Sequence, residues 1–148
     1  MAPRWAVVVL ALSVAGPALA NDYVARTAGA ATVIAVDRDS VRRVSHYRTG
    51  WTYELYRERN PLAGRRTQIT AILQLVNCKT LFSRRLKVVH YLEDGGVLSR
   101  FGPERAWHDD LRGSNTDLVL RAMCEGPDRA WARRRAGSVF ELYRQVWR

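Results

Sequence analysis

Apolar and polar residues alternate along the first half of the chain in segments of strand length. From Tyr47 to Leu55 every second residue is aromatic, aliphatic or threonine, and most residues between them are polar. A period of two is typical of a strand with one buried face. Upstream, Ala31–Asp37 is short, contains β-branched residues and ends in the turn-forming sequence DRDS. Ser45–Arg57, which contains the alternating run, and Ala31–Asp37 are therefore both predicted to be strands.

Two further segments extend this pattern. Gln68–Cys78 is apolar on both alternations, which favours a central strand covered on both faces; periodicity alone leaves a helix open, and the β-branched residues favour a strand. In Leu81–Leu92 the even positions are expected to face inward and Arg85 and Lys87 outward, although Arg84 breaks the pattern.

Turn signals separate these strands. The sequence NPLAG at 60–64 predicts a loop between the strand that includes Tyr47–Leu55 and the Gln68–Cys78 strand. Asp94-Gly95-Gly96 predicts a tight turn, after which Val97–Phe101 returns as the second strand of a hairpin.

The pattern becomes helical after Trp107. Ser114 is a good N-cap, and Gly126-Pro127 stops a helix after Cys124. Near the end, Ser138 and Glu141 form a capping box before a second amphipathic segment. Strands followed by helices predict an α+β domain: an antiparallel sheet of about five or six strands with one or two C-terminal helices packed on one face.

The first twenty residues resemble a secretory signal peptide. Arg4 precedes an apolar run that is too short to span a membrane, and Ala18-Leu19-Ala20 fits a cleavage site. We expect cleavage after Ala20 and no transmembrane segment in the remaining chain. An uncleaved anchor is the alternative interpretation.

These features divide the 148 residues into a signal peptide (1–20), an N-terminal segment (21–30), one folded domain (31–126) and a basic C-terminal helical segment (127–148). Cys78 and Cys124 are the only cysteines. In an oxidising compartment an even count indicates a disulfide, here joining the central strand to the first helix. A redox or nucleophilic thiol is the less favoured alternative, because no CxxC pair is present.

The net charge of +10 favours an anionic partner. Arginine accounts for nearly all of it, since Lys79 and Lys87 are the only lysines; GC-rich coding bias explains that preference as well as a selected anion-binding surface does. Two clusters are candidates for contact with an anion or a partner. Their residues are Arg85 and Lys87 on a strand, and Arg133, Arg134 and Arg135 between the two helices. A solvated surface is the simpler alternative for both.

The sequence contains no motif of an enzyme, a phosphate-binding loop or a metal site. His108-Asp109-Asp110 is the one local grouping of possible metal ligands, and a polar turn before a helix explains it better. No cofactor and no metal are expected. The aromatic residues at Tyr47, Trp51 and Tyr53 are open to two interpretations, a stacking platform or core packing, and their alternation favours the core.

The order of several short motifs resembles the surface-adhesin protein E family of exported bacterial proteins. The motifs are D-R-D-S-V at Asp37–Val41, V-N-C-K at Val76–Lys79, Tyr91 before the Asp94-Gly95-Gly96 turn, Trp107, and Ser114 leading to Cys124. Together they span about residues 31–126. Arg112 stands where a proline is expected, and the tail after Pro127 has no counterpart.

The resemblance implies an extracytoplasmic domain with a Cys78–Cys124 bridge and, in the family's namesake, binding to host extracellular proteins. The sequence thus predicts a non-enzymatic binding module in the bacterial periplasm or at the cell surface. Its partner is expected to be an acidic protein or another polyanion, with nucleic acid not expected as the physiological ligand, and a homodimer is possible. The alternative is a periplasmic structural or assembly factor that acts through protein contacts.

Overall fold

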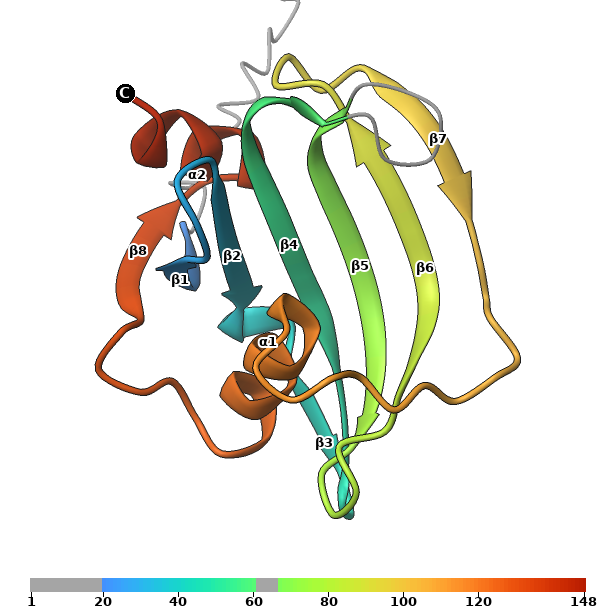
Figure 1. Ribbon diagram of the computed structural model, residues 1–148. Helices are drawn as coiled ribbons and strands as arrows, with labels where there is room; N and C mark the ends of the chain where they lie inside the picture. The colour runs from blue at the N-terminus through green and yellow to red at the C-terminus, as the bar shows by residue number, and fades with distance from the viewer. Residues whose placement is uncertain (1–19, 61–66) are drawn as a thin grey trace, which may run out of the picture.

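An eight-stranded antiparallel sheet and two helices make up the described part of the chain (Figure 1). The computed structural model describes residues 20–60 and 67–148, so the predicted signal peptide and the NPLAG loop lie outside the described residues. The elements are β1 (Asn21–Thr27), β2 (Thr32–Asp37), the 3-10 turn η1 (Arg38–Ser40), β3 (Arg42–Val44), β4 (Tyr47–Asn60), β5 (Thr67–Asn77), β6 (Ser83–Tyr91), β7 (Val97–Phe101), α1 (Asn115–Cys124), β8 (Ala132–Ala136) and α2 (Val139–Val146).

The strands follow the order β7-β6-β5-β4-β2-β1-β8, and β3 pairs with β4 off this path. β4 is long enough to hold two partners along one edge: its upper half pairs with β2 and its lower end with β3. β5 covers the other edge from Tyr47 to Leu55. The predicted strands at 31–37, 45–57, 68–78, 81–92 and 97–101 correspond to β2, β4, β5, β6 and β7.

The two helices pack on opposite faces of the sheet. Leu142 and Tyr143 of α2 share a core with Tyr53, Leu55 and other side chains on one face of the sheet. On the other face, Leu120 and the rest of the apolar side of α1 contact a second core, which consists of Val24, Ile34, Val36 and Val76. Two separate cores form because alternate residues of β1, β2, β4 and β5 point to opposite sides.

Two predictions about the architecture are wrong. The sheet has eight strands, not five or six, and the helices occupy both faces, not one. The two helices also do not follow one another at the C-terminal end, because β8 lies between them and pairs with β1. β8 has the sequence ARRRA, which does not resemble a buried strand; charged residues of this kind are common at the edge of a sheet, where they discourage pairing with other chains.

The predicted caps at Ser114 and Ser138 and the predicted turn at Asp94-Gly95-Gly96 are confirmed. The hydroxyl groups of Ser114 and Ser138 accept hydrogen bonds from the backbone N–H groups of Asp117 and Glu141, as N-caps do. In the β6–β7 turn the Asp94 carboxylate accepts the N–H of Gly96 at 2.8 Å. Each of these contacts spans only a few residues, which is why the sequence predicted them.

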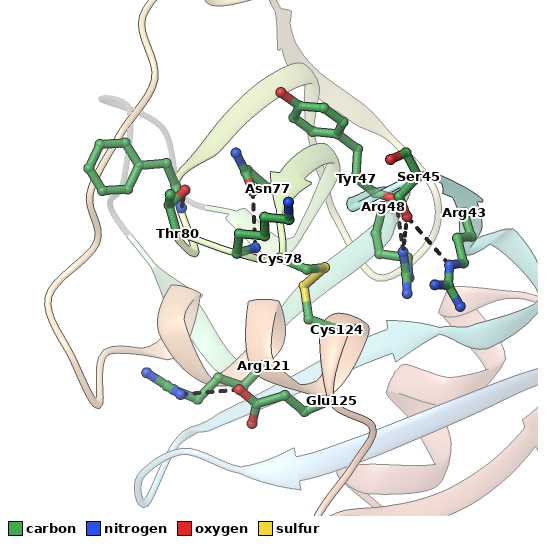
Figure 2. Close-up of a disulfide and its surroundings, with 12 residues drawn as sticks. Arg43, Ser45, Tyr47, Arg48, Asn77, Cys78, Thr80, Arg121, Cys124 and Glu125 are labelled. Atoms are coloured by element: carbon green, nitrogen blue, oxygen red, sulfur yellow. Dashed lines mark hydrogen bonds and ion pairs between the residues drawn. A yellow bond between two sulfur atoms is a disulfide. The ribbon is translucent and has the colours of Figure 1, made fainter.

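The disulfide between Cys78 and Cys124 is also confirmed, with the two Cα atoms 5.4 Å apart. Cys78 follows the end of β5, and Cys124 is the last residue of α1. The bridge therefore joins the helix to the lower end of the sheet, beside the β3–β4 turn (Figure 2).

A bulge in β6 changes which residues face outward. Lys87 is opposite Leu73, whereas Arg85 is opposite Gln74, so one extra residue separates these pairs on β6. Arg85 and Lys87 therefore lie on opposite faces of the sheet, and the predicted alternation over 81–92 does not hold. Arg84, which broke that pattern, places its guanidinium carbon 5.5 Å from the centre of the Trp107 ring.

Candidate functional site

The arginine and lysine residues predicted as a binding site do not form one surface. Arg85 and Lys87 belong to β6, whereas Arg133, Arg134 and Arg135 belong to β8, and four strands separate β6 from β8 in the sheet. In the structure, only Arg133, Arg134 and Arg135 lie near one another, because they are consecutive residues of β8. Even there, neighbouring residues alternate between the two faces.

Arg133 and Arg135 are engaged by a buried carboxylate. Arg133 Nε donates to Asp22 Oδ1 at 2.7 Å, and Arg135 Nε lies 3.8 Å from the same oxygen. Arg38 contacts the second oxygen of Asp22 at 3.2 Å. The hydrogen bond from Arg133 holds the pKa of Asp22 below its usual range, against the opposing effect of burial. These guanidinium groups are therefore partly neutralised within the fold.

The other predicted residues have mixed surroundings. Arg85 lies 3.6 Å from Glu104, so it too has a carboxylate partner. Arg134 and Lys87 are exposed and form no ion pair with any carboxylate in the described residues. Lys87 is the more informative of the two, because it lies at the margin of an uncovered area of the sheet.

This area, which we call the open face, is the lower part of the sheet face on which α2 packs. The α2 helix covers Tyr53, Leu55, Ile69 and Ala71, but the residues below them on β4 and β5 are only half-buried. Residues that pair across neighbouring strands define three rows of the open face. In the first row Val44 pairs with Tyr47. In the second, Thr49 lies between Arg42 and Leu75, and in the third, Leu73 lies between Trp51 and Lys87.

An apolar hollow of about 300 Å³ lies in the open face. It is lined by Val44, Tyr47, Thr49, Leu75 and Trp107. The ring centres of Tyr47 and Trp107 are 6.1 Å apart, and Arg84 packs on the Trp107 ring. Trp107 reaches the hollow because its segment pairs with β6 through reciprocal backbone hydrogen bonds between Ser83 and His108.

The β3–β4 turn forms one side of the hollow. Ser45 adopts a φ of 54°, in the left-handed region that a tight hairpin requires. Its carbonyl accepts hydrogen bonds from Arg43 and Arg48, both at 3.4 Å, as Figure 2 shows. The backbone N–H of Cys78 donates to the His46 carbonyl at 2.9 Å, which fixes the turn to the segment that carries the disulfide.

Cations without acidic partners lie around the hollow and at the adjoining strand edge. We call these cations the basic rim. None of their charged nitrogens lies within 4.0 Å of a carboxylate of the described residues. The members of the basic rim are Arg42, Arg84 and Lys87 on the open face, together with Arg43 and Arg48, which the register places on the opposite face at the same strand edge. Their recorded contacts are with backbone carbonyls and an aromatic ring, so their charge is not compensated locally.

Sequence reasoning identified only parts of this site. The sequence predicts Lys87 as a contact residue and leaves a stacking platform as one interpretation of the aromatic residues of β4. The structure divides the latter: Tyr53 is buried in the core, whereas Tyr47 and Trp51 are half-buried on the open face. Val44, Leu75 and Trp107 come from three separate segments, and no local signal in the sequence connects them.

The acidic and histidine residues near the hollow have structural contacts. His108 Nε2 lies 2.9 Å from Glu104, and Asp110 accepts a hydrogen bond from the Ser83 hydroxyl at 3.0 Å. Across residues 20–60 and 67–148, no three His, Cys, Asp or Glu side chains are grouped as metal ligands. Within the same residues, no helix is both long and apolar enough to cross a membrane.

Comparison with protein families shows which family the described domain resembles. The family model of surface-adhesin protein E matches residues 23–125, which is more than half of the chain. The match ends before β8 and α2. Neither the curated proteins nor the solved structures compared with the chain gave a match.

Proposed function

The chain belongs to the surface-adhesin protein E family, and from that premise we propose that it is an exported, non-enzymatic binding module of the bacterial envelope. Its binding surface is the open face with the basic rim, and its partner is an acidic protein or another polyanion. The single observation that carries the proposal is the apolar hollow with Arg42, Arg84 and Lys87 on the same face, none of which has a carboxylate partner among the described residues.

Charge compensation elsewhere in the fold supports this choice of surface. Exposed arginines that already contact a carboxylate attract a polyanion weakly, because the nearby negative charge reduces the local potential. The arginines around Asp22 and the Arg85–Glu104 pair are of this kind. The basic rim has no such carboxylate neighbour among the described residues, which supports it as a surface that attracts an anion.

A salt titration tests this proposal. The disulfide-bonded chain is bound to immobilised heparin as a polyanion probe over a range of salt concentrations. Replacing Arg42, Arg43 and Lys87 together by glutamine is expected to weaken binding by about tenfold or more at low salt and to flatten its salt dependence, because fewer counterions are released.

The matched control replaces Arg134, Arg144 and Arg148, which lie away from the open face, by glutamine. This variant removes the same charge but should keep most of the binding. Equal losses in the two variants would show that only net charge matters. A larger loss in the control would place the binding surface near β8 and contradict the proposal.

A further inference from the structure

We propose that the hollow and the outer edge of β3 together bind an extended acidic segment of a partner polypeptide, which inserts one apolar side chain into the hollow. This inference rests on the proposed function and specifies the chemistry of the partner. It depends on three features that meet at the lower end of the sheet: an apolar cavity, an unpaired strand edge and an uncompensated cluster of arginines.

The hollow is suited to one large apolar side chain. Its volume of about 300 Å³ is at the lower end of the range for binding pockets, and its lining residues are apolar or aromatic apart from Thr49. Tyr47 and Leu75 are recessed and half-buried in its floor, while Val44, with 67% of its surface exposed, stands at the side next to β3. Burial of a leucine or aromatic side chain here would remove apolar surface on both partners from water.

β3 provides the backbone for strand addition. In the described part of the chain β3 pairs with β4 alone, and all of its residues are exposed. A strand edge of this kind presents unpaired N–H and C=O groups, to which an extended peptide can add as a further strand. Only a polypeptide can use this edge and the hollow at the same time.

The arginines on and beside β3 determine the charge of the partner. Arg42 and Arg43 belong to β3, and Arg48 is opposite Arg43 on β4; Arg42 shares the face of the hollow, whereas Arg43 and Arg48 lie on the other face. Each donates hydrogen bonds to nearby backbone carbonyls, which holds the guanidinium groups beside the strand edge. In an added strand whose apolar side chain points into the hollow, the residues on either side of it point to the other face, where their carboxylates would form charge-assisted hydrogen bonds with Arg43 and Arg48.

A bilayer surface fits the same features less well. Proteins that dock on membranes insert protruding apolar side chains among the lipids. Here the aromatic and aliphatic floor is recessed, and a flat surface does not reach Leu75 or pair with the edge of β3. The concave shape therefore favours a polypeptide over a lipid surface.

A labelled peptide tests the inference. The probe is a capped heptapeptide in which glutamate alternates with valine around one central leucine, and its binding to the disulfide-bonded chain is followed by fluorescence anisotropy. We expect binding that weakens with salt and falls about tenfold when the central leucine is replaced by alanine. N-methylation of alternate backbone nitrogens should also weaken binding, because it removes hydrogen-bond donors without changing charge.

Variants of the chain locate the binding site. Val44→Asp introduces a negative charge beside the hollow at an exposed position, so the fold is retained and peptide binding is expected to fall about tenfold or more. Val44→Arg keeps the basic character but obstructs the hollow, so it should lose the preference for leucine over alanine. Leu111→Asp is the matched control, because Leu111 is 84% exposed and lies outside the hollow, and it should bind the peptide with little change.

Heparin and vesicles that contain phosphatidylglycerol are tested in parallel as alternative anionic ligands. If either binds while leucine replacement and N-methylation leave peptide binding unchanged, this inference is overturned and the proposed function stands. If the peptide binds equally well to Val44→Asp, the hollow is not the site. If none of the three probes binds at low salt, the proposed function fails as well.

Discussion

At the residue scale, the position of each carboxylate decides which arginines are available to a partner. Asp22 is buried at the start of β1, where Arg38, Arg133 and Arg135 approach it. The same carboxylate links β8 to β1 and lowers the positive potential of the β8 arginines. The cluster that looked most basic in the sequence is therefore partly a structural contact.

This role predicts a pH-dependent effect of Asp22→Asn. Because the pKa of Asp22 is lowered in the fold by Arg133, its stabilising contribution is complete above the ordinary carboxyl pKa and is lost as the pH falls through the lowered value. The variant should unfold at a lower urea concentration than the wild type at pH 7, and the difference should shrink in acid.

Asp128→Asn is the control for that measurement, because Asp128 pairs with Arg26 at an exposed position. Exposed ion pairs contribute little to stability, so this variant should behave as the wild type does. A constant difference between Asp22→Asn and the wild type from neutral pH down to strong acid would contradict the assigned ion pairs.

At the element scale, the disulfide connects α1 to the part of the sheet that carries the open face. The bridge closes a loop between residues 46 positions apart. Replacing both cysteines by alanine is expected to lower the free energy of unfolding by about 4 kcal/mol in the chain-entropy model. Urea denaturation of the oxidised wild type and the double variant measures this difference.

Reduction of the wild type is the accompanying control. It should reproduce the stability of the double variant, because both lack the same covalent link. If reduction or replacement leaves the urea midpoint unchanged, the loop between Cys78 and Cys124 is already ordered in the unfolded chain, and the entropic argument does not apply to this bridge.

The bulge in β6 is a second effect at this scale. A single extra residue moves Lys87 to the open face and leaves Arg85 on the face where Gln74 lies. Without the bulge, both cations would project to the same side. One irregularity in one strand therefore decides which of two neighbouring cations joins the basic rim.

At the scale of the whole molecule, the short α2 helix both completes the core and leaves the open face uncovered. Val139, Leu142 and Tyr143 are buried against the sheet, while among the described elements no helix covers the rows below Trp51. The family match ends at residue 125, but the core that α2 completes includes side chains of β1, β2, β4 and β5.

We therefore expect a chain that ends at Gly126 not to fold. Each large apolar side chain of α2 contributes about 1.5–3 kcal/mol by burial, and the loss of several is comparable with the total stability of a small domain. The measurement is circular dichroism together with the dispersion of amide signals in the NMR spectrum. A well-dispersed spectrum of the truncated chain would contradict this expectation.

Point variants give a graded form of the same test. Leu142→Ala should lower the free energy of unfolding by about 2–5 kcal/mol, because Leu142 is fully buried. Arg144→Ala, on the exposed side of the same helix, should change it by less than about 0.5 kcal/mol. Similar effects of the two variants would show that α2 does not pack as described.

The sequence by itself determined the features that depend on neighbouring residues. The period of two from Tyr47 to Leu55, the caps at Ser114 and Ser138 and the turn at Asp94 all arise from contacts over a few positions, and the structure confirms them. The only cysteine pair, Cys78 and Cys124, left a single possible disulfide.

Only the tertiary structure decided which surface is open and which charges are compensated. Pairing of β8 with β1 brings Arg133 to Asp22, the bulge in β6 places Lys87, and Trp107 reaches Tyr47 from a distant segment. Burial and charge compensation depend on residues that are far apart in the chain. Burial and charge compensation are therefore determined by strand pairing and helix packing, and no local pattern in the sequence predicts them.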